Sequence, residues 1–193
     1  MSALPKKIYT LEEYFQLELD SNERFEYFNG KVYSMAGVNQ EHDAIESNVH
    51  TSIKLKLRGK KCRAFLANMR LKVPSLPPYR YSDGSALCGE AVFEKIGGVD
   101  VLVNPQVIIE VLSDSTEKFD RDLKFKHYKS IESFREYLLI SQESYFVVHY
   151  HKYNEKFWMQ TEYDKLEDIV NLNTLDCDLT LAEIYEDITL PAE

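Results

Sequence analysis

The run Val107-Ile108-Ile109-Glu110-Val111-Leu112 constrains the fold more than any other segment, because five of its six residues are apolar. A short and nearly continuous apolar run predicts a β-strand that is covered on both faces. Such a strand needs helices or other layers packed on each side of its sheet, and helix signals occur both before and after it. The sequence therefore predicts an α/β or α+β fold with a mixed sheet.

The signals for the other elements lie on both sides of this run. Thr10 and Glu13 have the spacing of a capping box, which predicts a helix through about Leu19. Asn29-Gly30 predicts a hairpin within residues 24–36, and Asn39 can cap a helix whose apolar residues repeat every four positions. Strands are also expected over 62–66, 69–73, 79–87, 91–95, 99–103, 136–141, 145–152 and 156–163, and helices over 118–130 and after residue 180.

Length and composition limit the class of protein. A chain of 193 residues without repeats or low-complexity linkers predicts a single domain over residues 1–193. Cys62, Cys88 and Cys177 are an odd and scattered set without a CxxC pair, so we expect free thiols in a reducing cytosol. The first residues lack the apolar run of a signal peptide, and no stretch approaches 18 apolar residues. These features predict a cytoplasmic protein without a membrane span.

Charge is distributed unevenly along the chain, whose net charge is −9. Residues 47–82 include nine Lys or Arg and no acidic residue, whereas residues 162–193 include ten acidic residues and one lysine. The basic segment predicts either a phosphate-binding surface or an ordinary solvated helix face and guarded strand edge. The acidic segment leaves a protein-interaction module open as a third class. The candidate nucleic-acid-binding residues are Lys54, Arg58, Lys60, Lys61, Arg63, Arg70 and Lys72.

Glu110 is the most informative polar residue. Alternation along the strand places it on the same face as Ile108 and Leu112. A buried and unpaired carboxylate is strongly unfavourable, so we expect a metal ion or another cation beside it. The alternative is a carboxylate at the end of the strand that accepts a hydrogen bond from a loop.

Three further candidates each have an ordinary explanation as well. Asp83 precedes a glycine, where the backbone can admit a ligand closely, but aspartates of this kind are common in turns. Glu26 can pair with Lys31 across the expected hairpin. Lys124 lies four residues after Asp120 on the expected helix, a spacing typical of a surface salt bridge.

The histidines and Tyr128 carry less information. His149 and His151 face the same side of an expected strand and could act as ligands, but we interpret them as ordinary residues of an exposed face. His42 lies near a helix start, where it can help to cap the helix or contact a phosphate. Tyr128 lies one turn beyond Lys124 and is expected to pack.

Several short motifs occur in a characteristic order over about residues 8–190. They are Phe25–Val32, Glu41-His42, Tyr81–Asp83, Ile109–Ser113 with Ser115-Thr116, Asp120–Tyr128 and Glu136–Ile140. In this order they resemble the Uma-type restriction endonuclease family of the PD-(D/E)XK nuclease superfamily. The resemblance implies an α/β fold of the restriction-endonuclease type, with a central mixed β-sheet flanked by helices.

The resemblance also implies a function and a site. Asp83 is the aspartate of the family signature, Glu110 is its second acid and Glu26 is an upstream acid. These three would bind Mg²⁺, with Mn²⁺ as an alternative ion. Leu112 replaces the lysine that usually follows the second acid, and Lys124 on the next helix takes that role. The implied activity is Mg²⁺-dependent hydrolysis of DNA phosphodiester bonds, with the basic segment contacting DNA.

Two residues depart from the family pattern. Ser82 replaces the proline before the aspartate, and Gly84 replaces a β-branched or apolar residue after it. They favour the alternative, a nuclease-fold module that binds nucleic acid or dimerises without cleaving. A homodimer is expected for an active enzyme, because cutting both strands of a duplex requires two sites.

Overall fold

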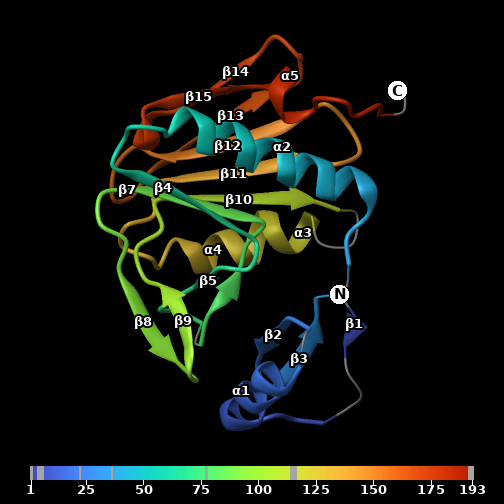
Figure 1. The fold of residues 1–193 in the computed structure, drawn as a ribbon, viewed down its shortest axis with the longest axis vertical. Coiled ribbons are helices and arrows are strands. Elements are labelled where there is room, and N and C mark those ends of the chain that lie inside the picture. Colours follow the sequence, from blue (N-terminus) through green and yellow to red (C-terminus); the bar gives the residue numbers. More distant parts are fainter. Residues whose placement is uncertain are drawn as a thin grey trace.

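The computed structural model describes residues 2–3, 7–21, 23–35, 37–76, 78–113 and 117–190. At its centre is a six-stranded mixed sheet in the order β13-β12-β11-β10-β7-β4 (Figure 1). β10 and β11 are parallel, and the other neighbours are antiparallel. The strands are β4 (Cys62–Leu66), β7 (Gly84–Cys88), β10 (Val107–Leu112), β11 (Glu136–Ser141), β12 (Val147–Lys152) and β13 (Trp158–Tyr163).

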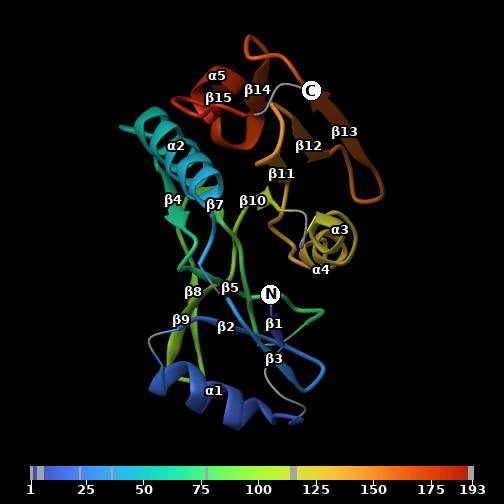
Figure 2. The same cartoon turned by 90° about the vertical axis from the view of Figure 1, so that its right-hand side faces the viewer.

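Helices cover both faces of this sheet, as the apolar run of β10 predicted. Figure 2 shows α2 (Gln40–Lys56) on one side of the sheet and α3 (Glu117–Phe119) with α4 (Phe125–Tyr128) on the other. A π-helical turn, η1 (Asp120–Lys124), joins α3 to α4. All six residues of β10 are buried. Ile109 packs in the core with α2, and Ile108 packs in the core with α4, so alternation along the strand sends neighbouring residues to opposite layers.

A second group of elements lies at the other end of the molecule (Figure 1). It contains α1 (Leu11–Asp20), whose capping box at Thr10 confirms the sequence prediction. A three-stranded sheet has the order β1-β3-β2, and a four-stranded sheet has the order β6-β5-β9-β8. Their strands are β1 (Ser2–Ala3), β2 (Phe25–Phe28), β3 (Lys31–Ser34), β5 (Arg70–Leu71), β6 (Arg80–Tyr81), β8 (Phe93–Ile96) and β9 (Val99–Leu102).

The chain differs from the predicted elements at several places. The expected strand over 79–87 is divided, because β6 joins the four-stranded sheet whereas β7 joins the central sheet. Two strands that the sequence did not predict, β14 (Ile169–Leu172) and β15 (Cys177–Thr180), lie with the helical turn η2 (Asn173–Leu175) and α5 (Leu181–Ile184) on the α2 side of the sheet. Ser115 and Thr116 lie outside the described residues. No helix among the described residues is long and apolar enough to span a membrane.

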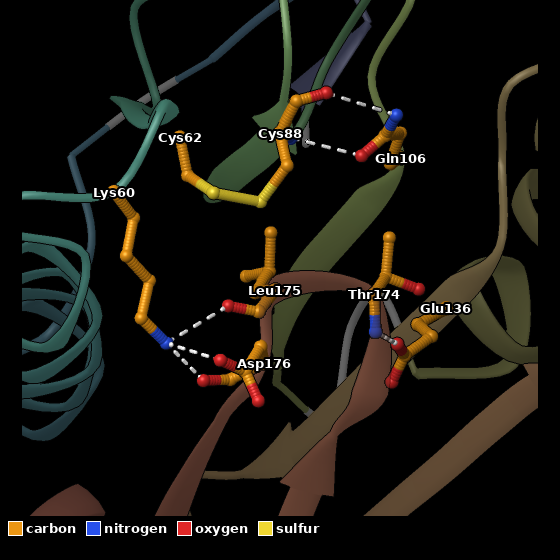
Figure 3. Close-up of a disulfide and its surroundings, with 8 residues drawn as sticks. All are labelled: Lys60, Cys62, Cys88, Gln106, Glu136, Thr174, Leu175 and Asp176. Atoms are coloured by element: carbon orange, nitrogen blue, oxygen red, sulfur yellow. Dashed lines mark hydrogen bonds and ion pairs between the residues drawn. A yellow bond between two sulfur atoms is a disulfide. The ribbon is translucent and has the colours of Figure 1, made fainter.

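His149 is buried, so its interpretation as a residue of an exposed face is wrong. The layer formed by β14, β15 and η2 covers this part of the sheet, which leaves the side chain of His149 4% exposed. Its Nε2 lies 2.7 Å from Oε2 of Glu136. Oε1 of Glu136 accepts a hydrogen bond from the backbone N–H of Thr174 at 2.6 Å (Figure 3). The Glu136 carboxylate thus joins the central sheet to η2.

The cysteine prediction is wrong for two of the three residues. Figure 3 shows that Cys62 and Cys88 form a disulfide between β4 and β7. Only Cys177 is a free thiol. The two residues are 26 positions apart in the sequence, but they lie directly opposite each other in the antiparallel pair. Spacing along the chain does not reveal that register. Two of the three thiols that indicated a reducing compartment are therefore oxidised.

Reduction of this disulfide is expected to lower the free energy of unfolding by about 3 kcal/mol, because it releases a closed loop in the unfolded chain. Urea denaturation with and without a reductant measures the difference, and Cys177→Ser serves as the control that leaves the disulfide intact. Alkylation of the unfolded, unreduced protein should label one cysteine. Labelling of all three would contradict the disulfide.

Candidate active site

A cavity of about 300 Å³ brings together residues from both ends of the molecule. Its wall includes all four residues that the sequence predicted as catalytic: Glu26, Asp83, Glu110 and Lys124. Glu26 comes from β2, Asp83 from the connection between β6 and β7, Glu110 from β10 and Lys124 from η1. His42, Asp120 and Gln142 line the same cavity. Acids far apart in the sequence therefore share one concave surface.

Glu110 lies in the interior of β10, and its side chain is 2% exposed. Its Oε2 accepts a hydrogen bond from Nζ of Lys124 at 2.7 Å, and its Oε1 accepts one from the hydroxyl of Tyr128 at 2.8 Å. The prediction of a cation beside this carboxylate is confirmed. Burial raises the pKa of Glu110 well above its usual value, and the charges of Asp83 and Asp120 add to the rise against the opposing effect of Lys124.

Lys124 is held between two carboxylates. Its Nζ lies 2.7 Å from Oε2 of Glu110 and 3.3 Å from Oδ1 of Asp120. The expected surface pair with Asp120 is instead buried, because η1 packs against the sheet. Burial acts to lower the pKa of Lys124, but Asp120, Glu110 and Glu26 outweigh it and raise the pKa well above its usual value. Lys124 is therefore a fixed ammonium group.

Asp83 lies where the chain passes from one sheet to the other. Its Oδ2 accepts a hydrogen bond from the backbone N–H of Val111 at 2.7 Å. The pairing of β7 with β10 ends at Gly84 and Ile109, so the Asp83 side chain takes the place of the next backbone partner of β10. Burial acts to raise the pKa of Asp83, but His42, Lys124 and the Val111 N–H lower it overall. Ser82, which replaces the family's proline, bonds through its hydroxyl to the carbonyl of Gly84 at 3.0 Å.

Glu26 is paired with Arg80 rather than with Lys31. Its Oε2 accepts a hydrogen bond from Nη1 of Arg80 at 2.6 Å, and both side chains are almost completely buried. The hairpin register places Tyr33 opposite Glu26, whereas Lys31 lies opposite Phe28. The pairing suggested from the sequence is therefore wrong, because it assumed a different register.

His42 and Glu46 add two potential ligands that the sequence reasoning did not assign. Asn39 caps α2 by accepting a hydrogen bond from the backbone N–H of His42 at 2.9 Å. Among the described residues, His42, Glu46 and Asp83 are the three whose potential metal-ligating atoms all lie within 4.8 Å of one another. Glu26 and Glu110 do not belong to that group. The available signal was the spacing of four between His42 and Glu46, which places both on one face of a helix.

The cavity has more acidic groups than basic ones. Four carboxyl groups line it, from Glu26, Asp83, Glu110 and Asp120, against one lysine and one histidine. Carboxylate oxygens are the ligands that hard divalent cations such as Mg²⁺ prefer. A cation would reduce the repulsion among these acids, so the donor set fits a divalent metal ion.

Comparison with known proteins identifies the family. Residues 11–183 match the model of the Uma2 family, which is described as "Putative restriction endonuclease". The chain belongs to the Uma2 family. This confirms the resemblance inferred from the order of motifs, and it supports a nuclease-like function.

Two relatives of this Uma2 chain come from Synechocystis sp. strain PCC 6803. The protein sll1609 is 34% identical over 156 residues, which cover 81% of this chain and 88% of the relative. The protein slr1290 is 29% identical over 174 residues, which cover 90% of each chain. Both are named as uncharacterized proteins.

A solved structure confirms the fold of this Uma2 chain. It is the crystal structure of "a putative nuclease belonging to DUF820" from Anabaena variabilis. The two chains superpose with a TM-score of 0.65 at 20% sequence identity, over 93% of this chain and 97% of the other. The prediction of an α/β fold with a central mixed sheet flanked by helices is confirmed.

Three of the seven candidate cations in the basic segment of this Uma2 chain form ion pairs with acids. Arg70 pairs with Glu18 at 3.0 Å, Lys72 pairs with Glu94 at 2.6 Å, and Lys60 pairs with Asp176 at 3.1 Å. These three cations stabilise contacts between elements. The other four candidates, Lys54, Arg58, Lys61 and Arg63, are exposed. Lys54 and Arg58 lie near the C-terminal end of α2, whereas His42 lies at the end of α2 that borders the cavity.

Proposed function

We propose that this protein is a metal-dependent endonuclease that hydrolyses DNA phosphodiester bonds at the cavity, using Mg²⁺ or Mn²⁺. The observation that carries the proposal is the convergence of Glu26, Asp83, Glu110 and Lys124 on one cavity wall. Membership of the Uma2 family supports the same class of reaction.

The acids of the cavity are the residues that would hold the ion. Asp83 would be the main anionic ligand of the ion, because the lowered pKa of Asp83 favours the charged carboxylate. Glu110 and Glu26 line the same cavity and complete the acidic wall. A bound divalent ion polarises a scissile phosphate, lowers the pKa of a water molecule and offsets charge on the leaving oxygen.

Lys124 would supply a positive charge next to the nucleophilic water and the phosphate. Its ammonium group is fixed by Glu110 and Asp120, so it is positioned in advance of substrate binding. A fixed cation orients a nucleophilic water and stabilises the negative charge that develops on the phosphate. The hydroxyl of Tyr128 holds the other oxygen of Glu110, which makes Tyr128 a positioning residue.

DNA would be bound by the exposed cations Lys54, Arg58, Lys61 and Arg63. They belong to a basic segment within a chain whose net charge is −9. Each phosphate contact releases counterions, so four contacts predict a slope of about −3.6 for log K against log salt concentration. Cleavage of both strands would require two copies of the chain, and we propose a homodimer on DNA for that reason.

Metal removal is the direct test. Purified protein is expected to nick supercoiled plasmid in the presence of Mg²⁺ or Mn²⁺, to lose that activity in excess EDTA, and to regain it when the ion is restored. Agarose electrophoresis measures the nicked and linear products. Cleavage that persists in EDTA, or intact plasmid with both ions, would contradict the proposal.

A second candidate function is supported by one observation. Both carboxylate oxygens of Glu110 are already hydrogen-bonded, to Lys124 and to Tyr128. A nuclease-fold module that has lost catalysis would keep such a closed network while still binding DNA or a second copy. DNA binding without nicking under both metal conditions distinguishes this function from the first.

A further inference from the structure

The group formed by His42, Glu46 and Asp83 carries an inference that deepens the proposed function and rests on its metal dependence. We propose that these three residues bind the divalent cation together, and that the imidazole of His42 makes the site prefer Mn²⁺ to Mg²⁺. Their potential ligand atoms all lie within 4.8 Å of one another. One ion can therefore contact a nitrogen and two carboxylates.

The buried imidazole of His42 independently supports a metal ion at this position. Its side chain is 9% exposed, and within the described part of the chain its Nε2 is buried without a hydrogen-bond partner. This nitrogen lies 3.5 Å from Oδ2 of Asp83. That distance exceeds the 2.7–2.9 Å range that is typical of a charge-assisted hydrogen bond. A buried polar atom without a partner is unfavourable, and a metal ion would satisfy it.

The helix supports this geometry. His42 and Glu46 are separated by four residues on α2, so they lie on one face and one turn apart. Two ligands at this spacing on a helix are a common arrangement in metal sites. The Asn39 cap fixes the first turn of α2 and thereby the position of His42. Asp83 approaches from the connection before β7, where its bond to Val111 holds the carboxylate.

The donor types determine which ion the site prefers. Mg²⁺ favours oxygen ligands and retains several waters, whereas imidazole nitrogen suits transition-metal ions. Mn²⁺ accepts carboxylates as readily as Mg²⁺ does and also accepts nitrogen ligands. A site with one imidazole and two carboxylates is therefore expected to bind Mn²⁺ more tightly than Mg²⁺.

Isothermal titration of the full chain with MnCl₂ and with MgCl₂ tests the preference. His42→Gln is expected to weaken Mn²⁺ binding at least about tenfold and to reduce the Mn²⁺/Mg²⁺ ratio. Glu46→Gln should weaken both ions. The matched control is His50→Gln, on the same helix but outside the group, which should leave both affinities within about twofold of wild type. Equal Mn²⁺ affinity in wild type and His42→Gln would overturn the inference.

Pulsed EPR of the Mn²⁺-loaded wild-type protein gives a readout that needs no variant to fold. A directly bound imidazole nitrogen produces a ¹⁴N coupling, and the absence of that coupling would overturn the inference. The result is separable from the plasmid assay. A ¹⁴N coupling with intact plasmid would support the ligands and refute the nuclease, whereas metal-dependent nicking without the coupling would do the reverse.

Discussion

Asp83→Asn is expected to lower the rate of metal-dependent plasmid nicking by at least about 10³-fold while the protein remains folded. A metal ion contributes several kcal/mol to stabilising the transition state, and each 1.4 kcal/mol corresponds to about a factor of ten in rate. The substitution removes the negative charge that would bind the ion. The amide oxygen of asparagine can still accept the hydrogen bond from Val111, so the junction between the sheets is preserved.

The matched control for this experiment is Asp164→Asn, because Asp164 is exposed and lies outside the cavity wall. It should nick plasmid at the wild-type rate. Circular dichroism and thermal melting of both variants check that the fold is retained. If Asp83→Asn cleaved at the rate of the control, the catalytic centre would lie elsewhere.

Lys124→Met is expected to abolish nicking and to lower the free energy of unfolding by about 3–5 kcal/mol. The substitution removes the cation that lies 2.7 Å from Glu110 and 3.3 Å from Asp120, so two buried carboxyl groups lose the positive charge beside them. The loss of stability is measured by urea denaturation. Lys126→Met, two positions further along at an exposed site, should change neither stability nor activity.

The double variant Glu110→Gln with Lys124→Met separates stability from catalysis. Glu110→Gln removes one of the two carboxyl charges beside the missing lysine, so the double variant should be more stable than Lys124→Met alone. It should remain inactive, because neither the acid nor the ammonium group is restored. A single variant as stable as wild type would show that the buried pair contributes nothing to folding.

The position of Glu110 could be predicted from local pattern, and the identity of its partners could not. Alternation within residues 107–112 determines that Glu110 lies on the same side as Ile108, and the structure agrees. The contact with Lys124 depends on how η1 packs on the sheet, and only the family resemblance anticipated that Lys124 belongs to the site. Likewise, Glu26 and Arg80 are 54 positions apart and meet through tertiary packing alone.

The errors share a physical cause, which is that burial and register are properties of the whole fold. Cys62 and Cys88 became partners through the register of β4 and β7. His149 became buried because β14 and β15, two short strands with weak sequence signals, cover its face. His42 and Glu46 carried a helical spacing that was visible in the sequence, but their proximity to Asp83 required the structure.

The π-helical turn at Asp120–Lys124 makes the length of this segment as important as its composition. A π turn contains one residue more than an α turn, so it is equivalent to a single insertion in a regular helix. Removing one residue of α3 with the π turn kept would rotate Lys124 by about 100° around the helix axis and turn its ammonium group away from Glu110. Removing one residue within the turn would instead restore regular α winding and leave the lysine facing nearly the same way. Among homologues, a one-residue deletion should therefore be tolerated more readily within this turn than just before it.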